Sequence, residues 1–189
     1  MAVMLARLIL FFVGGVVGAW LDHLHVSFGV LGYPAPVLFD QPVWVVPLFG
    51  SAALILVLGH ALFRNSGEAR PTLPQVTSSI ATFTLAYFAT AAGNSRPNFI
   101  LLLLTASWGL LAAGPGFRKR ALYCVAIAAG GTLFEIFLSR VLGGFAYRVD
   151  RPLGGVPIWL PALYLHAALL TRQLDLAFFA PRQTTTGNS

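Results

Sequence analysis

Six continuous apolar runs constrain this chain more than any other feature of its sequence. Each run has roughly 17–25 residues, the length of helix that crosses a hydrocarbon layer about 30 Å thick. The runs lack the apolar–polar alternation of a membrane β-barrel, so they predict helices. We expect spans at residues 5–25, 44–63, 75–94, 97–114, 121–141 and 157–178.

These spans predict an all-α integral membrane protein. A bundle of six transmembrane helices would form a single domain over residues 1–182, followed by a disordered polar tail at residues 183–189. Composition supports this class, because 57% of the residues are hydrophobic and only 10% are charged. A soluble domain carries about 25% charged residues. Too few polar side chains remain here to cover a water-facing globule.

The formal net charge of +6 comes from basic residues at the ends of the apolar runs. They form no patch along one element, which argues against nucleic-acid binding and indicates membrane orientation instead. With the N-terminus inside, eight Lys and Arg residues lie on the inner side and four on the outer side, which predicts two cytoplasmic termini. The inner set is Arg7, Arg64, Arg70, Arg118, Lys119, Arg120, Arg172 and Arg182, and the outer set is Arg96, Arg140, Arg148 and Arg151.

Glu135 and His166 are ionisable residues well inside the fifth and sixth predicted spans. Such groups are costly in a bilayer and indicate function by default. The fifth helix runs outward and the sixth returns, so the two side chains could meet. Two interpretations stay open: a polar anchor or proton-handling pair in a cavity, and a structural hydrogen bond between helices.

The remaining polar residues predict no catalytic centre, no metal site and no cofactor. Asp22 and His25 share one helical face beside His23, but no further His or acid completes a ligand set, so we expect solvated interfacial residues. We expect His60 to reach the headgroups. The single cysteine, Cys124, allows no intrachain disulfide and no Cys-based metal site.

Small and hydroxyl-bearing residues recur on several predicted helices. Gly14 with Gly18, and Ala126 with Gly130, have the small-xxx-small spacing that lets helices approach closely. The same residues could instead leave room for a lipid and hydrogen-bond its head. Under this second interpretation, helices one, three, four and five form the pocket, and the lipid-binding residues are Gly14, Gly18, Thr82, Ala86, Thr105, Ser107, Ala126, Gly130, Glu135 and His166.

Three segments, in this order, resemble the Insig (insulin-induced gene) family. They are Arg7–Phe12 with Gly14, Trp44–Gly50 entering the second run, and Trp159–Pro161 opening the sixth run, which ends at Arg172–Leu174. Animal Insig proteins are six-span proteins of the endoplasmic reticulum. They bind oxysterol, retain the escort protein Scap and link HMG-CoA reductase to degradation. The resemblance therefore implies a sterol-responsive binding protein and not an enzyme.

Two differences from the animal Insig proteins limit what the resemblance implies. The spacing from Trp159 to Arg172 is about one helical turn shorter than in animal members, and no Asp or Glu occurs between Glu68 and Glu135, where animal members use an acid for partner binding. A Scap-like or reductase-like partner is therefore not expected. The absence of a polar N-terminal extension favours a compact prokaryotic homologue.

Several functional alternatives stay open from the sequence. The ligand would be a sterol or, in a membrane without sterols, a hydroxyl-bearing lipid such as diacylglycerol. The membrane would be the plasma membrane of a prokaryote or the endoplasmic reticulum of a eukaryote, and homo-oligomerisation is left open. The competing functions are an intramembrane lipid-modifying enzyme that uses Glu135 and His166, and a small transporter.

Overall fold

Six α-helices dominate a computed structural model of the protein, which describes residues 2–64 and 68–180. The predicted tail at 183–189 lies outside the described residues. A single 3-10 turn, η1 (His60–Leu62), extends the second helix, and two short strands, β1 (Leu31–Gly32) and β2 (Ala146–Tyr147), pair with each other. The helices are α1 (Ala2–Ser27), α2 (Val45–Gly59), α3 (Leu73–Ala92), α4 (Pro97–Ala112), α5 (Phe117–Arg140) and α6 (Leu160–Phe178).

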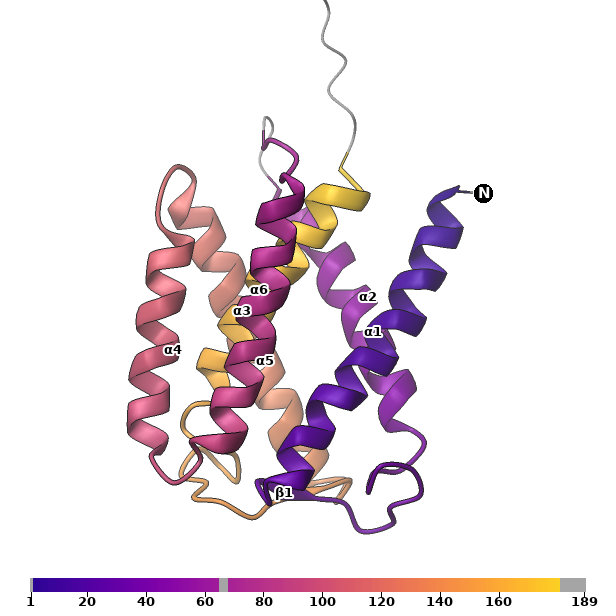
Figure 1. Ribbon diagram of the computed structural model, residues 1–189, viewed down its shortest axis with the longest axis vertical. Coiled ribbons are helices and arrows are strands. Elements are labelled where there is room, and N and C mark those ends of the chain that lie inside the picture. The colour runs from indigo at the N-terminus through magenta and orange to yellow at the C-terminus, as the bar shows by residue number, and fades with distance from the viewer. Residues whose placement is uncertain (1, 65–67, 181–189) are drawn as a thin grey trace, which may run out of the picture.

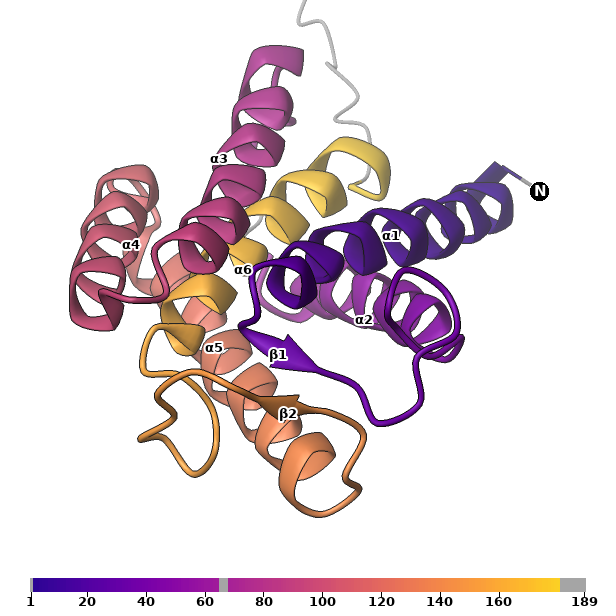
Figure 2. The same ribbon diagram turned by 60° about the horizontal axis from the view of Figure 1, so that its bottom comes forward.

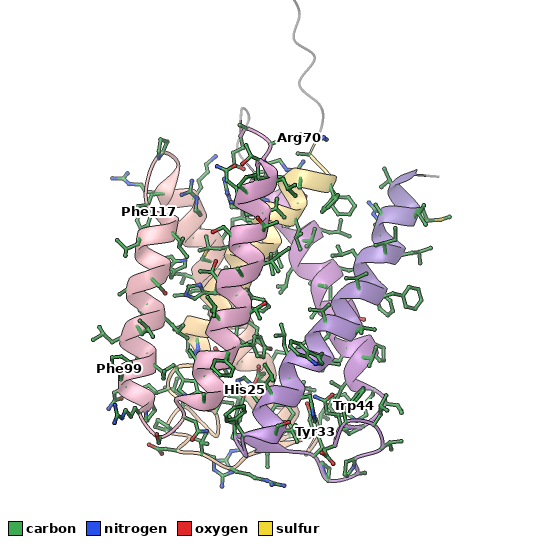
Figure 3. All side chains as sticks on the ribbon, viewed as in Figure 1. His25, Tyr33, Trp44, Arg70, Phe99 and Phe117 are labelled. Atoms are coloured by element: carbon green, nitrogen blue, oxygen red, sulfur yellow. The ribbon has the colours of Figure 1, made fainter. Side chains whose placement is uncertain are left out.

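The helices alternate in direction, so that α1 begins and α6 ends at the same end of the bundle (Figure 1). We call this the terminal end. The opposite end, the loop end, holds β1, β2 and the turn from α3 to α4, and the two strands lie side by side there in Figure 2. Figure 3 shows Arg70 and Phe117 at the terminal end, and Tyr33 and Trp44 at the loop end. The prediction of a six-helix bundle is confirmed.

Proline and glycine set several helix boundaries. Proline occupies the first turn of α3, α4 and α6, where its fixed φ suits a helix and its missing N–H costs nothing. Gly116 precedes α5 with φ at 75°, a left-handed conformation that a side chain would strain. The short loops between α3, α4 and α5 follow directly from these breaks.

Three helices are long and apolar enough to cross a membrane by length and composition, namely Val3–Ser27, Val45–Leu62 and Phe117–Arg140, and Pro97–Ala112 is a shorter apolar helix. Large apolar side chains cover their outer faces: Phe12 is 62% exposed, Leu110 81% and Leu133 65%. A soluble monomer rarely exposes so much apolar surface. The fold is that of a membrane protein.

The first two helices pack backbone against backbone through glycines. A Cβ built on Gly15 would lie 2.6 Å from the carbonyl oxygen of Val46, and one on Gly50 would lie 2.6 Å from that of Phe11. A Cβ built on Gly18 would lie 2.7 Å from the side chain of Phe49. The α1–α2 pair is therefore a closely packed hairpin whose contact requires glycine on both sides.

Orientation in the membrane stays a prediction, and cysteine labelling tests it. Lys119 and Asp150 are exposed near the terminal end and the loop end respectively, and Cys124 is fully buried, so its background labelling should be low. On intact cells, we expect an impermeant maleimide to label Asp150→Cys, and to label Lys119→Cys only after the membrane is opened. Labelling of both variants from one side would contradict the six-span arrangement.

Candidate functional site

An apolar cavity of about 500 Å³ lies between the α1–α2 hairpin and the pair formed by α3 and α6. We call it the apolar cavity. Aliphatic and aromatic side chains from all four helices line it, including Val13, Val17, Leu56, Phe83, Leu163 and Leu170. In Figure 1, α1 leans away from α3 and α6 toward the terminal end. The helices that form the cavity thus differ from the expected set, because α2 and α6 contribute and α4 does not.

One carboxylate, Glu135 of α5, reaches this apolar lining. Tyr164 of α6 donates a hydrogen bond to it at 2.7 Å, and Tyr147 of β2 donates another. Burial and the neighbouring Glu135 raise the pKa of Tyr147 well above its usual value, so this phenol stays protonated and donates. A carboxylate has about four acceptor sites. Glu135 therefore keeps capacity to accept a further hydroxyl.

A second polar network fastens α1 at the loop end. The carboxylate of Asp22 accepts hydrogen bonds from Tyr33 at 2.7 Å and from Gln41 at 2.6 Å. The ring of His25 lies 2.8 Å from the hydroxyl of Thr90. Burial and the nearby Asp22 raise the pKa of Tyr33 above its usual range, which keeps its hydroxyl a donor.

This network corrects the expectation that Asp22 and His25 are solvated. Their exposed fractions are 6% and 2%, because partners from the following loop and from α3 replace water. His23 is only half-buried and bonds the carbonyl of Phe39 at 2.8 Å. Over residues 2–64 and 68–180, no group of three or more His, Cys, Asp or Glu is placed to hold a metal.

Glu135 and His166 do not pair. His166 bonds Ser107 at 3.1 Å and the carbonyl of Leu104 at 3.0 Å, which ties α6 to α4. It lines a second cavity of about 550 Å³ between α3, α4, α5 and α6 near the terminal end. Three arginines line this cavity too, so we call it the basic cavity. The structural interpretation of His166, a helix-to-helix hydrogen bond, fits these contacts.

The other predicted lipid-binding residues separate into four groups. Gly14 and Gly18 line the apolar cavity, and Thr82 lines the basic cavity. Ala86 is buried in the main hydrophobic core. The outer surfaces of α4 and α5 carry the exposed residues Thr105, Ala126 and Gly130. The structure thus brings Gly14, Gly18 and Glu135 together and places the rest elsewhere.

A buried ion-pair cluster closes the terminal end. Asp175 of α6 is 0% exposed and lies 2.7 Å from His60 Nδ1 and 2.5 Å from Arg64 Nη2. His60 was expected to reach the headgroups, but it is 2% exposed because Asp175 binds it inside the bundle. Nearby, the hydroxyls of Tyr123 and Thr171 lie 2.8 Å apart. This cluster joins the α2 end to α6, and sequence reasoning missed it.

Two solved structures share this arrangement. A crystal structure of MvINS, a mycobacterial Insig homologue from Mycobacterium vanbaalenii, matches with a TM-score of 0.79 and 27% sequence identity over 94% of this chain and 96% of that chain. The chain is an Insig-like protein. The crystal structure of a cross-linked MvINS trimer matches with a TM-score of 0.73 and 27% identity over 94% and 97% of the two chains. No protein-family model and no curated protein matches the sequence.

These matches confirm the resemblance to Insig proteins that the three sequence motifs indicated. The positions of the motif residues show what these residues do in the fold. Trp44 and Trp159 occupy the position before the first turn of α2 and α6. Trp159 is 0% exposed in the main core. Gly50, at the end of the second motif, forms the α1–α2 contact. These motif residues therefore hold the Insig-like bundle together.

Proposed function

We propose that this Insig-like protein binds a sterol or another hydroxyl-bearing lipid, such as diacylglycerol, in the apolar cavity and acts as a sensor or regulator. The observation that carries the proposal is the chemistry of the cavity lining. About 500 Å³ of space is walled by apolar side chains with one carboxylate, Glu135. Small-molecule sites have this size and this combination of apolar wall and few polar groups.

The polar groups beside Glu135 support a ligand with a hydroxylated end at this point. Tyr164 bonds Glu135, and Thr84 and Tyr87 of α3 also line the cavity. Thr171, also in the lining, bonds Tyr123 toward the terminal end, and the remaining side chains are apolar. Glu135 is already held by two phenols, so it is oriented before a ligand arrives. A lipid would place its apolar bulk among α1, α2, α3 and α6 and its hydroxyl near Glu135.

A regulatory role is supported over catalysis by the separation of the two candidate catalytic residues. Glu135 lines the apolar cavity, whereas His166 lines the basic cavity and bonds Ser107. An acid–base pair needs both groups within reach of one substrate. Self-association is part of the proposal, because MvINS has been crystallised as a cross-linked trimer, and the mass of the purified protein–detergent complex tests it.

Three phenylalanine substitutions along α3 test the cavity. Thr84 lines it, Ala81 is exposed on the outer surface, and Ala86 is 3% exposed in the core. We expect Thr84→Phe to lower co-purifying lipid several-fold with little change in thermal stability, and Ala81→Phe to change neither quantity. Ala86→Phe should lower the free energy of unfolding by about 1–3 kcal/mol, because it overpacks a filled core.

Mass spectrometry of extracted lipid and thermal unfolding, measured on the same preparations, separate these outcomes. Unchanged lipid in a folded Thr84→Phe variant would refute binding in the apolar cavity. Loss of lipid in Ala81→Phe as well would mean that the lipid is bound at the outer surface.

Substitution of Glu135 tests whether its carboxylate anchors the hydroxyl of the ligand. Glu135→Gln keeps the size and the hydrogen-bonding capacity of the side chain and removes its charge, so we expect the protein to fold. Hydrogen bonds to charged groups are worth about 1.5–3 kcal/mol, so the preference for diacylglycerol over its acetylated analogue should fall about tenfold. Competition binding of the two lipids measures this ratio. An unchanged ratio would exclude Glu135 as the anchor.

A further inference from the structure

The basic cavity has a composition unlike that of the apolar cavity. Its lining includes Arg70 before α3, Arg120 in the first turn of α5, and Arg172 near the end of α6. Hydroxyl and amide side chains of α3 line it as well, including Ser78, Ser79 and Gln75. The cavity therefore gathers cationic and hydrogen-bonding groups at the end of the bundle where the basic loops lie.

The positive charge of this cavity is only partly compensated by the protein. Arg70 donates to the carbonyl of Ala180 at 2.7 Å, and Arg120 donates to the carbonyls of Ala112 at 2.6 Å and Pro115 at 2.9 Å. A carbonyl oxygen accepts a hydrogen bond from an arginine, but it is uncharged and does not cancel the positive charge of the guanidinium group. Arg172 alone of the three is described in a salt bridge, 3.0 Å from Glu68.

Sequence and structure together account for every carboxylate. The chain has six acidic residues, and all of them lie in the described residues. Asp22 and Glu135 bond tyrosines, and Asp175 is held by His60 and Arg64. Asp40 and Asp150 lie in the chain that joins helices at the loop end. Glu68, which bonds Arg172, is therefore the remaining carboxylate to set against the three arginines of the cavity.

Two of these guanidinium groups also keep unused donors. The Nε atoms of Arg120 and Arg172 are buried and have no hydrogen-bond partner among the residues that the structure describes. A buried unsatisfied donor costs free energy, about 1–3 kcal/mol or more for a charged group. A phosphate in the cavity would be attracted by the charge of these guanidinium groups, since arginine pairs well with phosphate.

From this geometry we propose that the basic cavity binds the phosphate headgroup of an anionic phospholipid from the leaflet at the terminal end. Basic pockets between transmembrane helices take such headgroups. The N-terminus of the 20-residue α3 also lies at the cavity, where the helix dipole favours an anion. This site is separate from the proposed neutral-lipid site.

A phospholipid fits the cavity better than a soluble anion does, because part of its wall is apolar. Leu111, Leu169 and Leu176 line it beside the arginines, and His166 marks its depth along α6. In Figure 2, α3 and α4 diverge from the turn that joins them. The arrangement suits a headgroup among the arginines with acyl chains following the apolar wall.

Two charge changes of equal size on α3 test this assignment. Gln75→Glu places a carboxylate in the lining and preserves the acceptor that takes the Thr72 N–H at 2.8 Å, so folding should be retained. Thr77→Glu adds the same charge at an exposed residue outside the lining and serves as the matched control. Arg70→Gln removes one exposed cation from the lining while leaving an amide donor.

Binding of phosphatidylglycerol, phosphatidylcholine of the same acyl chains, and inorganic phosphate is measured on the purified protein by native mass spectrometry and thermal shift. We expect wild type to prefer phosphatidylglycerol. Gln75→Glu and Arg70→Gln should each weaken that binding about 5-fold, and Thr77→Glu should change it less than about 2-fold.

Three results would overturn the proposal: equal binding of the two lipids, equal weakening by Gln75→Glu and Thr77→Glu, or saturation by inorganic phosphate without a preference for lipid. The Thr84→Phe variant should bind phosphatidylglycerol as wild type does, so failure of either site is distinguishable from failure of the other.

Discussion

Replacing Asp175 with alanine is expected to lower the free energy of unfolding by about 3–5 kcal/mol, because it leaves buried partners without their counter-charge. Asp175 is 0% exposed, and both His60 and Arg64 bond its carboxylate. His60 is itself 2% exposed, so water cannot replace the lost acceptor. Thermal or denaturant unfolding in detergent measures the loss.

A matched control removes the same kind of side chain from the surface. Asp150 is exposed at the loop end, so Asp150→Ala should change stability by less than about 0.5 kcal/mol. The stability loss of Asp175→Asn should lie between those of Asp175→Ala and Asp150→Ala, since the amide keeps an acceptor oxygen and loses the charge. Equal stability of Asp175→Ala and Asp150→Ala would show that the His60–Asp175–Arg64 cluster does not hold α6 to the end of α2.

The second large effect is expected at the glycine contact between α1 and α2. Gly50→Leu should cost about 3 kcal/mol or more, at the upper end of overpacking effects, because its Cβ would meet the backbone of α1. The oxygen of Phe11 at 2.6 Å belongs to a helical carbonyl, which cannot rotate aside as a side chain can. The helices would have to separate.

Gly109→Leu provides the comparison, since a Cβ on Gly109 meets no atom within 4 Å in the part of the chain that the structure describes. Leucine is a better helix former than glycine by about 1 kcal/mol, so this variant should be neutral or stabilised. Yield of folded protein and unfolding midpoint check both variants. A stable Gly50→Leu protein would mean that α1 and α2 can pack without close backbone contact.

The helices themselves were predictable because hydrophobicity and helix breakers are local properties of the sequence. The apolar runs, Pro97 and Gly116 predict where helices form and where they start. Gly14 and Gly18 also indicated close packing, which the structure shows against α2. The spacing alone could not distinguish this pair from Ala126 and Gly130, which have the same pattern but lie exposed on α5.

The polar networks could not be predicted because their partners are distant in sequence. His25 bonds Thr90, 65 residues away, and Asp175 bonds His60 across 115 residues. Without these partners, Asp22, His25 and His60 look like interfacial residues. A signal was present for Asp175: an acid inside an apolar run needs a buried cation, and Arg64 ends another run.

The sequence predicted that a lipid-sized cavity exists between the helices, but not where it lies. Small residues indicated space between helices, but the position of that space depends on how far the helices diverge, which no local pattern encodes. Thr82 and Ala86 on α3 were both expected to line the lipid pocket. The structure places Thr82 in the basic cavity and Ala86 in the main core, while Thr84 on another side of the helix reaches the apolar cavity.

The α1–α2 hairpin is fastened at both of its ends, each time through a different helix. Asp22 and His25 hold α1 at the loop end, and His60 and Arg64 hold the end of α2 to Asp175 of α6 at the terminal end. The wall that this hairpin contributes to the apolar cavity is therefore organised before a ligand arrives, and such preorganisation lowers the entropic cost of binding.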